Sequence, residues 1–208
     1  MSDDLWDAAI KEALASAPSD VVVLETLELI HPAFVDDSGN PTAIRVVLHE
    51  PHLETWLKQQ PVAVQAVLDA LDGDVVGQIG LVARLEEDAP RNAGEYVAFL
   101  SLAFQLELPT EDAEQLQEID VTLDNVGREI VEHLDAANLS QLPVEVRYRP
   151  YISSDISQPR MDPPLMVELG PVEVDVFTAK GRARIFDIGQ RAFPSESYTA
   201  KKYPGLAR

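Results

Sequence analysis

The stretch Leu-Ser-Leu-Ala-Phe-Gln-Leu-Glu-Leu at positions 100–108 is the clearest structural signal in the chain. Every second residue is large and apolar, and the residues between them are small or polar. Because successive side chains of a β-strand point to opposite faces of a sheet, this alternation predicts a strand with one buried face. Pro109 ends the pattern, since proline has no backbone N–H to donate to a neighbouring strand.

The pattern continues beyond an acidic loop and then changes period. Residues 119–123 alternate again, which predicts a second strand. Val126, Ile130 and Leu134 are then spaced by four, which predicts a helix that runs to about residue 137, with residue 124 or 125 as its cap. Residues 144–148 alternate once more. Positions 97–149 therefore predict two strands, a helix and a further strand.

The flanking sequence predicts more short strands. Residues 21–30 and 44–48 read as two strands joined by the turn-rich segment 36–41, and helical spacing is present in places within 62–71. Three further short strands are expected near 165–169, 172–178 and 182–187. Residues 3–15 read as a short N-terminal helix. The proline-rich segment 153–164 is expected to be an extended arm or a long loop.

Many short strands around one central helix predict a mainly β (α+β) fold. The specific expectation is a β-sandwich or barrel with one flanking helix, plus the N-terminal helix and an extended C-terminal arm. Residues 1–187 would form a single β-rich domain, within which 51–93 could be an excursion. Residues 188–208 would form the arm.

Charge is distributed very unevenly along the chain. The 208 residues carry a net charge of −20 and give a pI near 4.4. Residues 180–208 hold seven Lys/Arg and two acids, so that segment is +5 and residues 1–179 are −25. An acidic surface opposes specific nucleic-acid binding but suits a wall past which DNA slides, or simply a soluble monomer. The asymmetry favours docking of the basic end on an acidic neighbour.

Composition also limits the chemistry and the compartment. The chain has no cysteine, which excludes disulfides and thiolate metal sites. Acids near the N-terminus stand where a signal peptide has basic residues, and no apolar run reaches membrane length. We expect synthesis in the cytoplasm, release without a cleaved signal and no membrane span.

No residue cluster argues for catalysis or for a cofactor. The run His49-Glu50-Pro51-His52 has the wrong spacing for a metal-binding helix, and its proline forbids that geometry. The acidic turns at 36–40 and 69–74 could bind calcium, but such turns are usually held by their own hydrogen bonds. The acids at 86–88 read as a solvated loop. We therefore expect no catalytic, cofactor-binding or metal residues and a protein that is not an enzyme.

Five short motifs, taken in order, carry a resemblance to a known family. They are APSD (17–20) leading into LETLEL (24–29), IRVV (44–47), FQLELP (104–109), VTLDNVGREI (121–130), and the closing FP (193–194), YT (198–199) and YPGL (203–206). In this order they resemble an uncharacterised family of phage and prophage proteins encoded in tail-assembly clusters, near the tape-measure protein and a cell-wall peptidase. The match is poor over 51–93, and Tyr203 stands where the family more often has phenylalanine.

The resemblance implies a structural component of the tail tip of a long-tailed phage: a minor tail protein, in a distal tail or baseplate hub ring that joins the tail tube to the hub. Its partners would be copies of itself in a three- or six-fold ring, together with tail tube, tape-measure and hub proteins. The protein would be found in the virion after assembly in the bacterial cytoplasm. An acidic tube lumen would account for the acidic body. The alternatives are a wall-degrading hydrolase of the tail tip, using acids such as Glu86 or Asp74, and a tail-assembly chaperone absent from the mature particle.

Contacts between subunits are expected mainly from the C-terminal end. Aromatic and arginine side chains are the usual anchors of protein interfaces. The alternative to docking on a neighbouring subunit is that the C-terminal arm folds back onto its own domain. The candidate interface residues are Arg182, Arg184, Phe193, Tyr198, Tyr203, Pro204 and Leu206. The segment 153–164 is a second candidate for reaching a neighbour.

Overall fold

The computed structural model describes residues 21–36, 38–48, 62–71, 73–106, 118–124, 127–140, 142–175 and 178–185. The expected N-terminal helix (3–15) and C-terminal arm (188–208) lie outside these ranges. The described elements, in chain order, are β1 (Val23–Val35), β2 (Pro41–Leu48), α3 (Val62–Asp69), α4 (Gly73–Val76), β3 (Ile79–Arg84), β4 (Tyr96–Leu102), β5 (Phe104–Leu106), β6 (Glu118–Asp124), α5 (Arg128–Ser140), β7 (Val144–Ile152), β8 (Leu165–Leu169), β9 (Glu173–Val174) and β10 (Thr178–Ile185).

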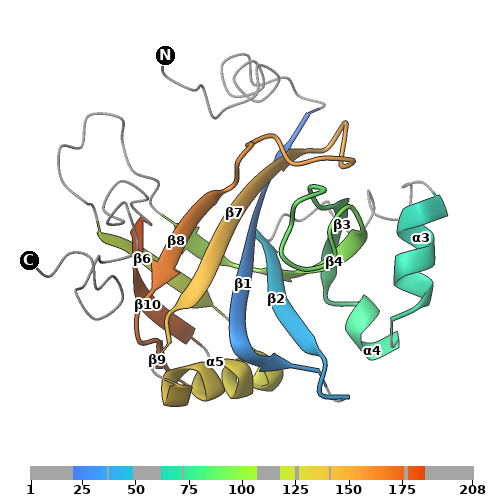
Figure 1. Ribbon diagram of the computed structural model, residues 1–208. Coiled ribbons are helices and arrows are strands. Elements are labelled where there is room, and N and C mark those ends of the chain that lie inside the picture. Colours follow the sequence, from blue (N-terminus) through green and yellow to red (C-terminus); the bar gives the residue numbers. More distant parts are fainter. Residues whose placement is uncertain are drawn as a thin grey trace, which may run out of the picture.

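Ten strands pair into one mixed sheet (Figure 1). The strand order is β3-β4-β2-β1-β7-β8-β10-β6-β5, and β9 pairs with β10 beside this path. The pairs are antiparallel except that of β2 with β4, which is parallel. The predicted mainly β fold is confirmed. The predicted sandwich or closed barrel is wrong, because there is a single sheet whose end strands, β3 and β5, do not pair with each other in the described ranges.

A break at Ala103 explains how the sheet curls while staying open. The sequence predicts one continuous strand over 100–108, but β4 ends at Leu102 and β5 begins at Phe104. The Ala103 carbonyl between them accepts a hydrogen bond from the Asp124 amide at 2.8 Å. On either side of this residue, β4 pairs with β2 and β5 pairs with β6, far apart in the strand order. The chain itself therefore bridges the two ends of a curled sheet.

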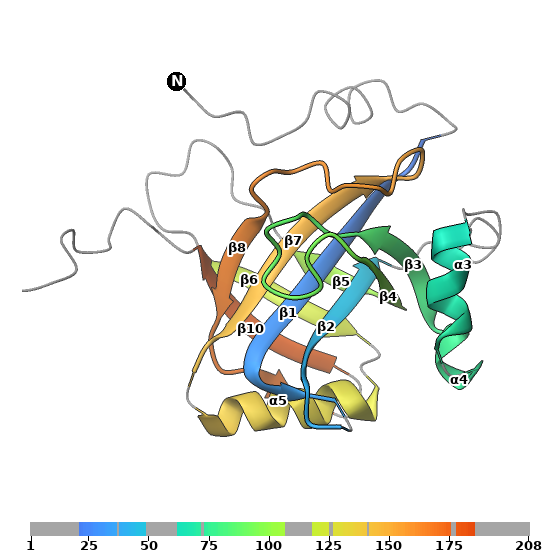
Figure 2. The same ribbon diagram turned by 45° about the vertical axis from the view of Figure 1, so that its right-hand side comes forward.

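The inner face of the curled sheet forms the main core, and α5 covers one end of it (Figures 1 and 2). Ile130, Leu134 and Ala137 lie on one side of α5 and are buried, as their helical spacing predicts. The strands contribute alternate residues to the same core, because every second side chain points inward. The central strand positions in this core are Leu27, Leu29, Ile44, Val46, Val121, Leu123, Val144, Val146, Tyr148, Val167 and Leu169.

A second core lies on the opposite face of β1, β2 and β7, beneath β3, β4 and α3. It includes Leu24, Val47, Leu81, Phe99 and Tyr151. Strand β1 is therefore covered on both faces, and the consecutive residues 27, 28 and 29 are all 0% exposed. One of them, Glu28, is a charged residue, and a buried charge needs an oppositely charged partner inside the protein.

The proline-rich segment 153–164 packs against its own domain, so of the two expected forms, an extended arm or a long loop, it is the long loop. Ile156 and Met161 are buried, and the Arg84 amide donates a hydrogen bond to the Ile156 carbonyl at 2.9 Å. The Arg160 amide donates to the Pro150 carbonyl at 2.8 Å. Burial of apolar side chains and paired backbone groups hold the loop in place. Within the described ranges, none of the helices combines the length and the apolar character that a membrane crossing requires.

Candidate functional site

A network of charged side chains fills the space between the outer face of the sheet and the loop that joins β3 to β4. Glu28 on β1 lies directly across from Arg45 on β2 and from Arg147 on β7 in the strand register. Arg149 lies two residues further along β7, on the same face. The Glu28 and Arg149 side chains are both 0% exposed, so their charges interact in a medium of low polarity.

Arg149 joins two carboxylates that are far apart in sequence. Its Nη1 donates to Glu28 Oε2 at 2.6 Å, and its Nε and Nη2 donate to the two oxygens of Glu86 at 2.8 and 2.6 Å. The bidentate contact with Glu86 fixes the direction as well as the distance of the pair. Because Glu86 belongs to the β3–β4 loop, this guanidinium fastens the loop to the sheet.

Two more arginines complete the attachment of the loop. Arg45 donates through Nε to the other Glu28 oxygen at 2.8 Å and through Nη2 to the Asn92 side-chain oxygen at 2.9 Å. Arg91 donates through Nη2 to the carbonyl of His31 at 3.1 Å. Both Glu28 oxygens are thus hydrogen-bonded, as a buried carboxylate requires.

The contact between Glu86 and Arg149 favours the charged form of both side chains. Burial alone would raise the pKa of the Glu86 carboxyl, but the hydrogen bonds and charge of Arg149 outweigh it and hold that pKa below its ordinary value. Burial alone would lower the pKa of Arg149, but its hydrogen bonds and attraction to Glu86 and Glu28 raise it. A general acid at neutral pH needs a raised pKa. Glu86 is shifted in the opposite direction and fits a structural anion.

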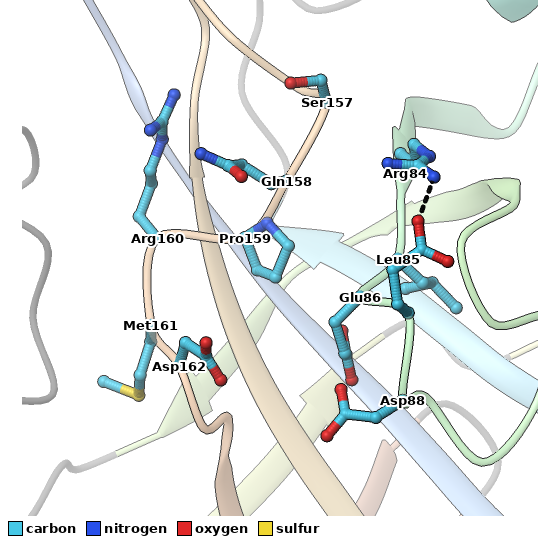
Figure 3. A pocket seen from close by; sticks show the side chains of 11 residues that line it. Arg84, Leu85, Glu86, Asp88, Ser157, Gln158, Pro159, Arg160, Met161 and Asp162 are labelled. Carbon is cyan, nitrogen blue, oxygen red and sulfur yellow. Dashed lines mark hydrogen bonds and ion pairs between the residues drawn. The ribbon is translucent and has the colours of Figure 1, made fainter.

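An open cleft of about 510 Å³ adjoins the network, between the start of the β3–β4 loop and residues 157–162 (Figure 3). Arg84 lies in its wall and pairs with Glu87. Figure 3 shows Asp88 on one wall and Asp162 on the other. The Ser157 hydroxyl donates to Asp155 at 2.6 Å. In the described ranges, no group of His, Cys, Asp and Glu side chains is arranged to hold a metal ion.

The buried His31 pairs with the exposed Ser140, and the two do not have the arrangement of a catalytic dyad. His31 Nδ1 accepts a hydrogen bond from the Ala33 amide at 2.9 Å, so a neutral ring carries its proton on Nε2. That nitrogen is 2.9 Å from Ser140 Oγ, which also donates to the Ala137 carbonyl at 2.7 Å. His31 therefore donates to the hydroxyl and cannot accept its proton as a general base. The pair ties β1 to the last turn of α5.

The predicted interface residues fall into two groups. Phe193, Tyr198, Tyr203, Pro204 and Leu206 lie outside the described residues. Arg182 and Arg184 are exposed on the outer face of β10, in line with Lys180. In the strand register Arg184 lies across from Glu168, and Lys180 lies across from Glu173. Acids on neighbouring strands thus flank this basic row, and its role in an interface stays a prediction.

Sequence reasoning missed the charge network, although its signals are visible afterwards. Glu28 interrupts an apolar strand, and Arg147 and Arg149 alternate with Val146 and Tyr148. This pattern is what a strand with a solvated outer face also shows. The prediction of a solvated loop at 86–88 is confirmed for Glu87 and Asp88, which are exposed, but is wrong for Glu86. The turn at 36–40 is closed by Asp36, which accepts hydrogen bonds from the Ser38 and Asn40 amides.

Fold and site together define a mainly β domain on one curled, open mixed sheet, with a loop fastened to it by buried ion pairs. The chain belongs to the family described as domain of unknown function DUF1833, whose model matches residues 9–198. Comparison with curated proteins and with solved structures gave no match.

Proposed function

We propose that the protein is a structural component of the tail tip of a long-tailed phage, a subunit of a distal tail or hub ring that joins the tail tube to the hub around an acidic DNA lumen. The ordered sequence motifs support this role. Under this proposal the protein is assembled in the bacterial cytoplasm and remains in the virion.

The observation that carries the proposal is the way the fold distributes its charges. Most basic side chains that the structure places are partly or fully buried: Arg45, Arg84, Arg91, Arg147, Arg149 and Arg160. Ten of the described acids, in contrast, are exposed: Asp36, Asp69, Glu87, Asp88, Glu95, Glu132, Asp135, Asp162, Glu173 and Asp175. Of the basic side chains whose exposure the structure describes, only Lys180, Arg182 and Arg184 are exposed, so the described surface carries ten acids against three basic residues. Such a surface repels phosphates, as the lining of a DNA channel should.

The buried network supports the same role mechanically. A ring subunit needs a fixed shape, because its contacts must repeat around a closed symmetry. Arg149 fastens a loop to the sheet through ion pairs that exclude solvent, and α5 is tied to β1 by His31 and Ser140. These contacts restrict the relative movement of the elements.

The test is the composition of finished particles. Phage particles purified from a host that carries the gene are analysed by mass spectrometry, and cryo-electron microscopy of the tails locates the protein. We expect it at the distal end of the tube, in a fixed ratio to the tube protein. Its absence from particles that require its gene for assembly would replace the proposal with the chaperone alternative. Peptidoglycan turnover by the purified protein would replace it with the hydrolase alternative.

A further inference from the structure

An apolar groove of about 250 Å³ lies where the end of α5 meets the start of β7 and the turn after β8. Its walls include Ala137, Leu142, Pro143 and Pro171. Leu142, in the wall of the groove, is 54% exposed. An exposed leucine within an apolar hollow is a sign of a docking surface.

Hydrogen bonds hold the groove open in one shape. The Asn138 side chain donates to the Val172 carbonyl at 2.9 Å and accepts from the Val172 amide at 3.0 Å, so it fixes α5 to the turn after β8. Ser140 Oγ accepts from the Leu142 amide at 3.2 Å. A preformed groove loses little conformational entropy when a partner binds.

Acidic side chains stand on the elements around this apolar surface. Glu132 and Asp135 are exposed on α5, and Glu173 and Asp175 are exposed at β9. The complementary partner is therefore a segment with apolar or aromatic anchors and positive charge. Residues 198–206 of this chain, Tyr-Thr-Ala-Lys-Lys-Tyr-Pro-Gly-Leu, have that composition.

We propose that this groove binds the C-terminal segment 186–208 of a second copy of the chain, with Tyr198, Tyr203 and Leu206 as anchors and Lys201 and Lys202 facing the acids. The inference rests on the proposed ring function and deepens it. Because groove and segment are different surfaces, each copy gives one contact and receives one, which is the arrangement that closes a ring.

The direction of β10 favours a neighbouring copy over the segment's own groove. The Gly170 amide beside the groove donates to the Arg182 carbonyl at 2.9 Å, and β10 then runs on to Ile185, across from Val167. Within the described residues, β10 therefore runs away from its own groove toward its end at Ile185. The 23 residues of 186–208 span on the order of 75 Å when extended, which is enough to reach another subunit.

The absence of cysteine from the chain allows a direct test by disulfide trapping. Full-length Leu142→Cys and full-length Tyr203→Cys are mixed under mild oxidation, and cross-linked dimers are measured on non-reducing gels. Val22→Cys with Tyr203→Cys is the matched control, because Val22 before β1 is 45% exposed, close to the 54% of Leu142, and does not line the groove. We expect about ten-fold more cross-linked dimer at position 142 than at position 22, and about ten-fold less when Lys201 and Lys202 are both changed to Glu.

Equal cross-linking at positions 22 and 142 would overturn the proposal. So would a dilute double variant, Leu142→Cys with Tyr203→Cys, that forms only the bond within one molecule, because the segment would then occupy its own groove. Specific cross-linking between copies in a protein that is missing from phage particles would retain the docking surface and reject the tail-tip function. Incorporation of the protein into tails without this cross-link would retain the tail-tip function and reject the docking surface.

Discussion

The guanidinium of Arg149 lies 2.6 Å from the carboxylate of Glu28, and neither side chain is exposed to solvent. The two residues are 121 positions apart in the sequence, and they meet because β1 and β7 are neighbours in the sheet. Two oppositely charged groups in this setting stabilise each other only while both are present, since either one alone is a buried unpaired charge.

Replacing Arg149 with methionine should therefore destabilise the protein strongly. The substitution leaves Glu28 without one of its two partners and frees Glu86 from the sheet, with an expected loss of about 3–5 kcal/mol in the free energy of unfolding. Urea denaturation followed by circular dichroism measures the change. Arg182→Met on the exposed face of β10 is the control, expected to change stability by less than about 1 kcal/mol. Equal effects of the two substitutions would contradict the role assigned to Arg149.

Leu134 should be the most sensitive apolar position of α5. Its side chain is 0% exposed, whereas Leu139 on the same helix is 85% exposed. Leu134→Ala should lower the free energy of unfolding by about 2–5 kcal/mol, because it removes buried methyl groups and leaves a cavity. Leu139→Ala should change it by no more than about 0.5 kcal/mol in the isolated subunit. Both values come from chemical denaturation, and a similar loss for both variants would contradict the packing of α5.

Local structure was predictable from the sequence because it depends on side-chain periodicity. The alternation in 119–123 and 144–148 and the four-residue spacing of Ile130 and Leu134 correspond to β6, β7 and α5. These patterns report which face of an element is apolar. They do not report which strand pairs with which, since any strand with one apolar face can fit many sheet positions.

The features that sequence reasoning missed all depend on long-range pairing. Ala103 fits the alternation of 100–108, so nothing local marks it as the point where the partner strand changes. Glu86 lies among solvent-exposed acids, and only its contact with Arg149 on a distant strand distinguishes it. The same limit applies to His31, whose contact with Ser140 spans 109 positions.

Acid should weaken the fold through His31. Burial lowers the pKa of the His31 imidazole below its ordinary value of 6.5. A hydrogen bond with the Leu142 backbone acts in the opposite direction, and the positive charge of Arg91 lowers the pKa further. The unfolded chain then binds the proton more readily than the folded one. The contribution of neutral His31 to the free energy of unfolding is fully present above pH 6.5. It is lost as the pH falls from there through the folded-state pKa.

A His31→Gln variant isolates this effect. Free energies of unfolding of both proteins are measured at about pH 7.5 and about pH 5.5, so that other titrating groups contribute equally to each. The wild type should lose more stability than the variant over this interval. An equal loss would mean that His31 has the same proton affinity in the folded and unfolded chains.

Gly80 should tolerate no side chain, because β3 lies directly against β2 and the end of β4 at this point. A Cβ atom built at Gly80 would lie 2.7 Å from Val47 Cγ1 and 2.9 Å from Ser101 Cβ, both shorter than a normal carbon contact. Gly80→Ala should therefore cost about 1–3 kcal/mol by forcing the strands apart. At Gly77, in the turn before β3, a Cβ atom would meet nothing within 4 Å and the backbone has no left-handed torsion, so Gly77→Ala should be neutral or stabilise by up to about 1 kcal/mol. Thermal and urea denaturation of the two variants measure the difference. If Gly80→Ala left the free energy of unfolding unchanged, β3 and the outer face of β2 would not be in close contact. The packing described for the second core would then be wrong at this point.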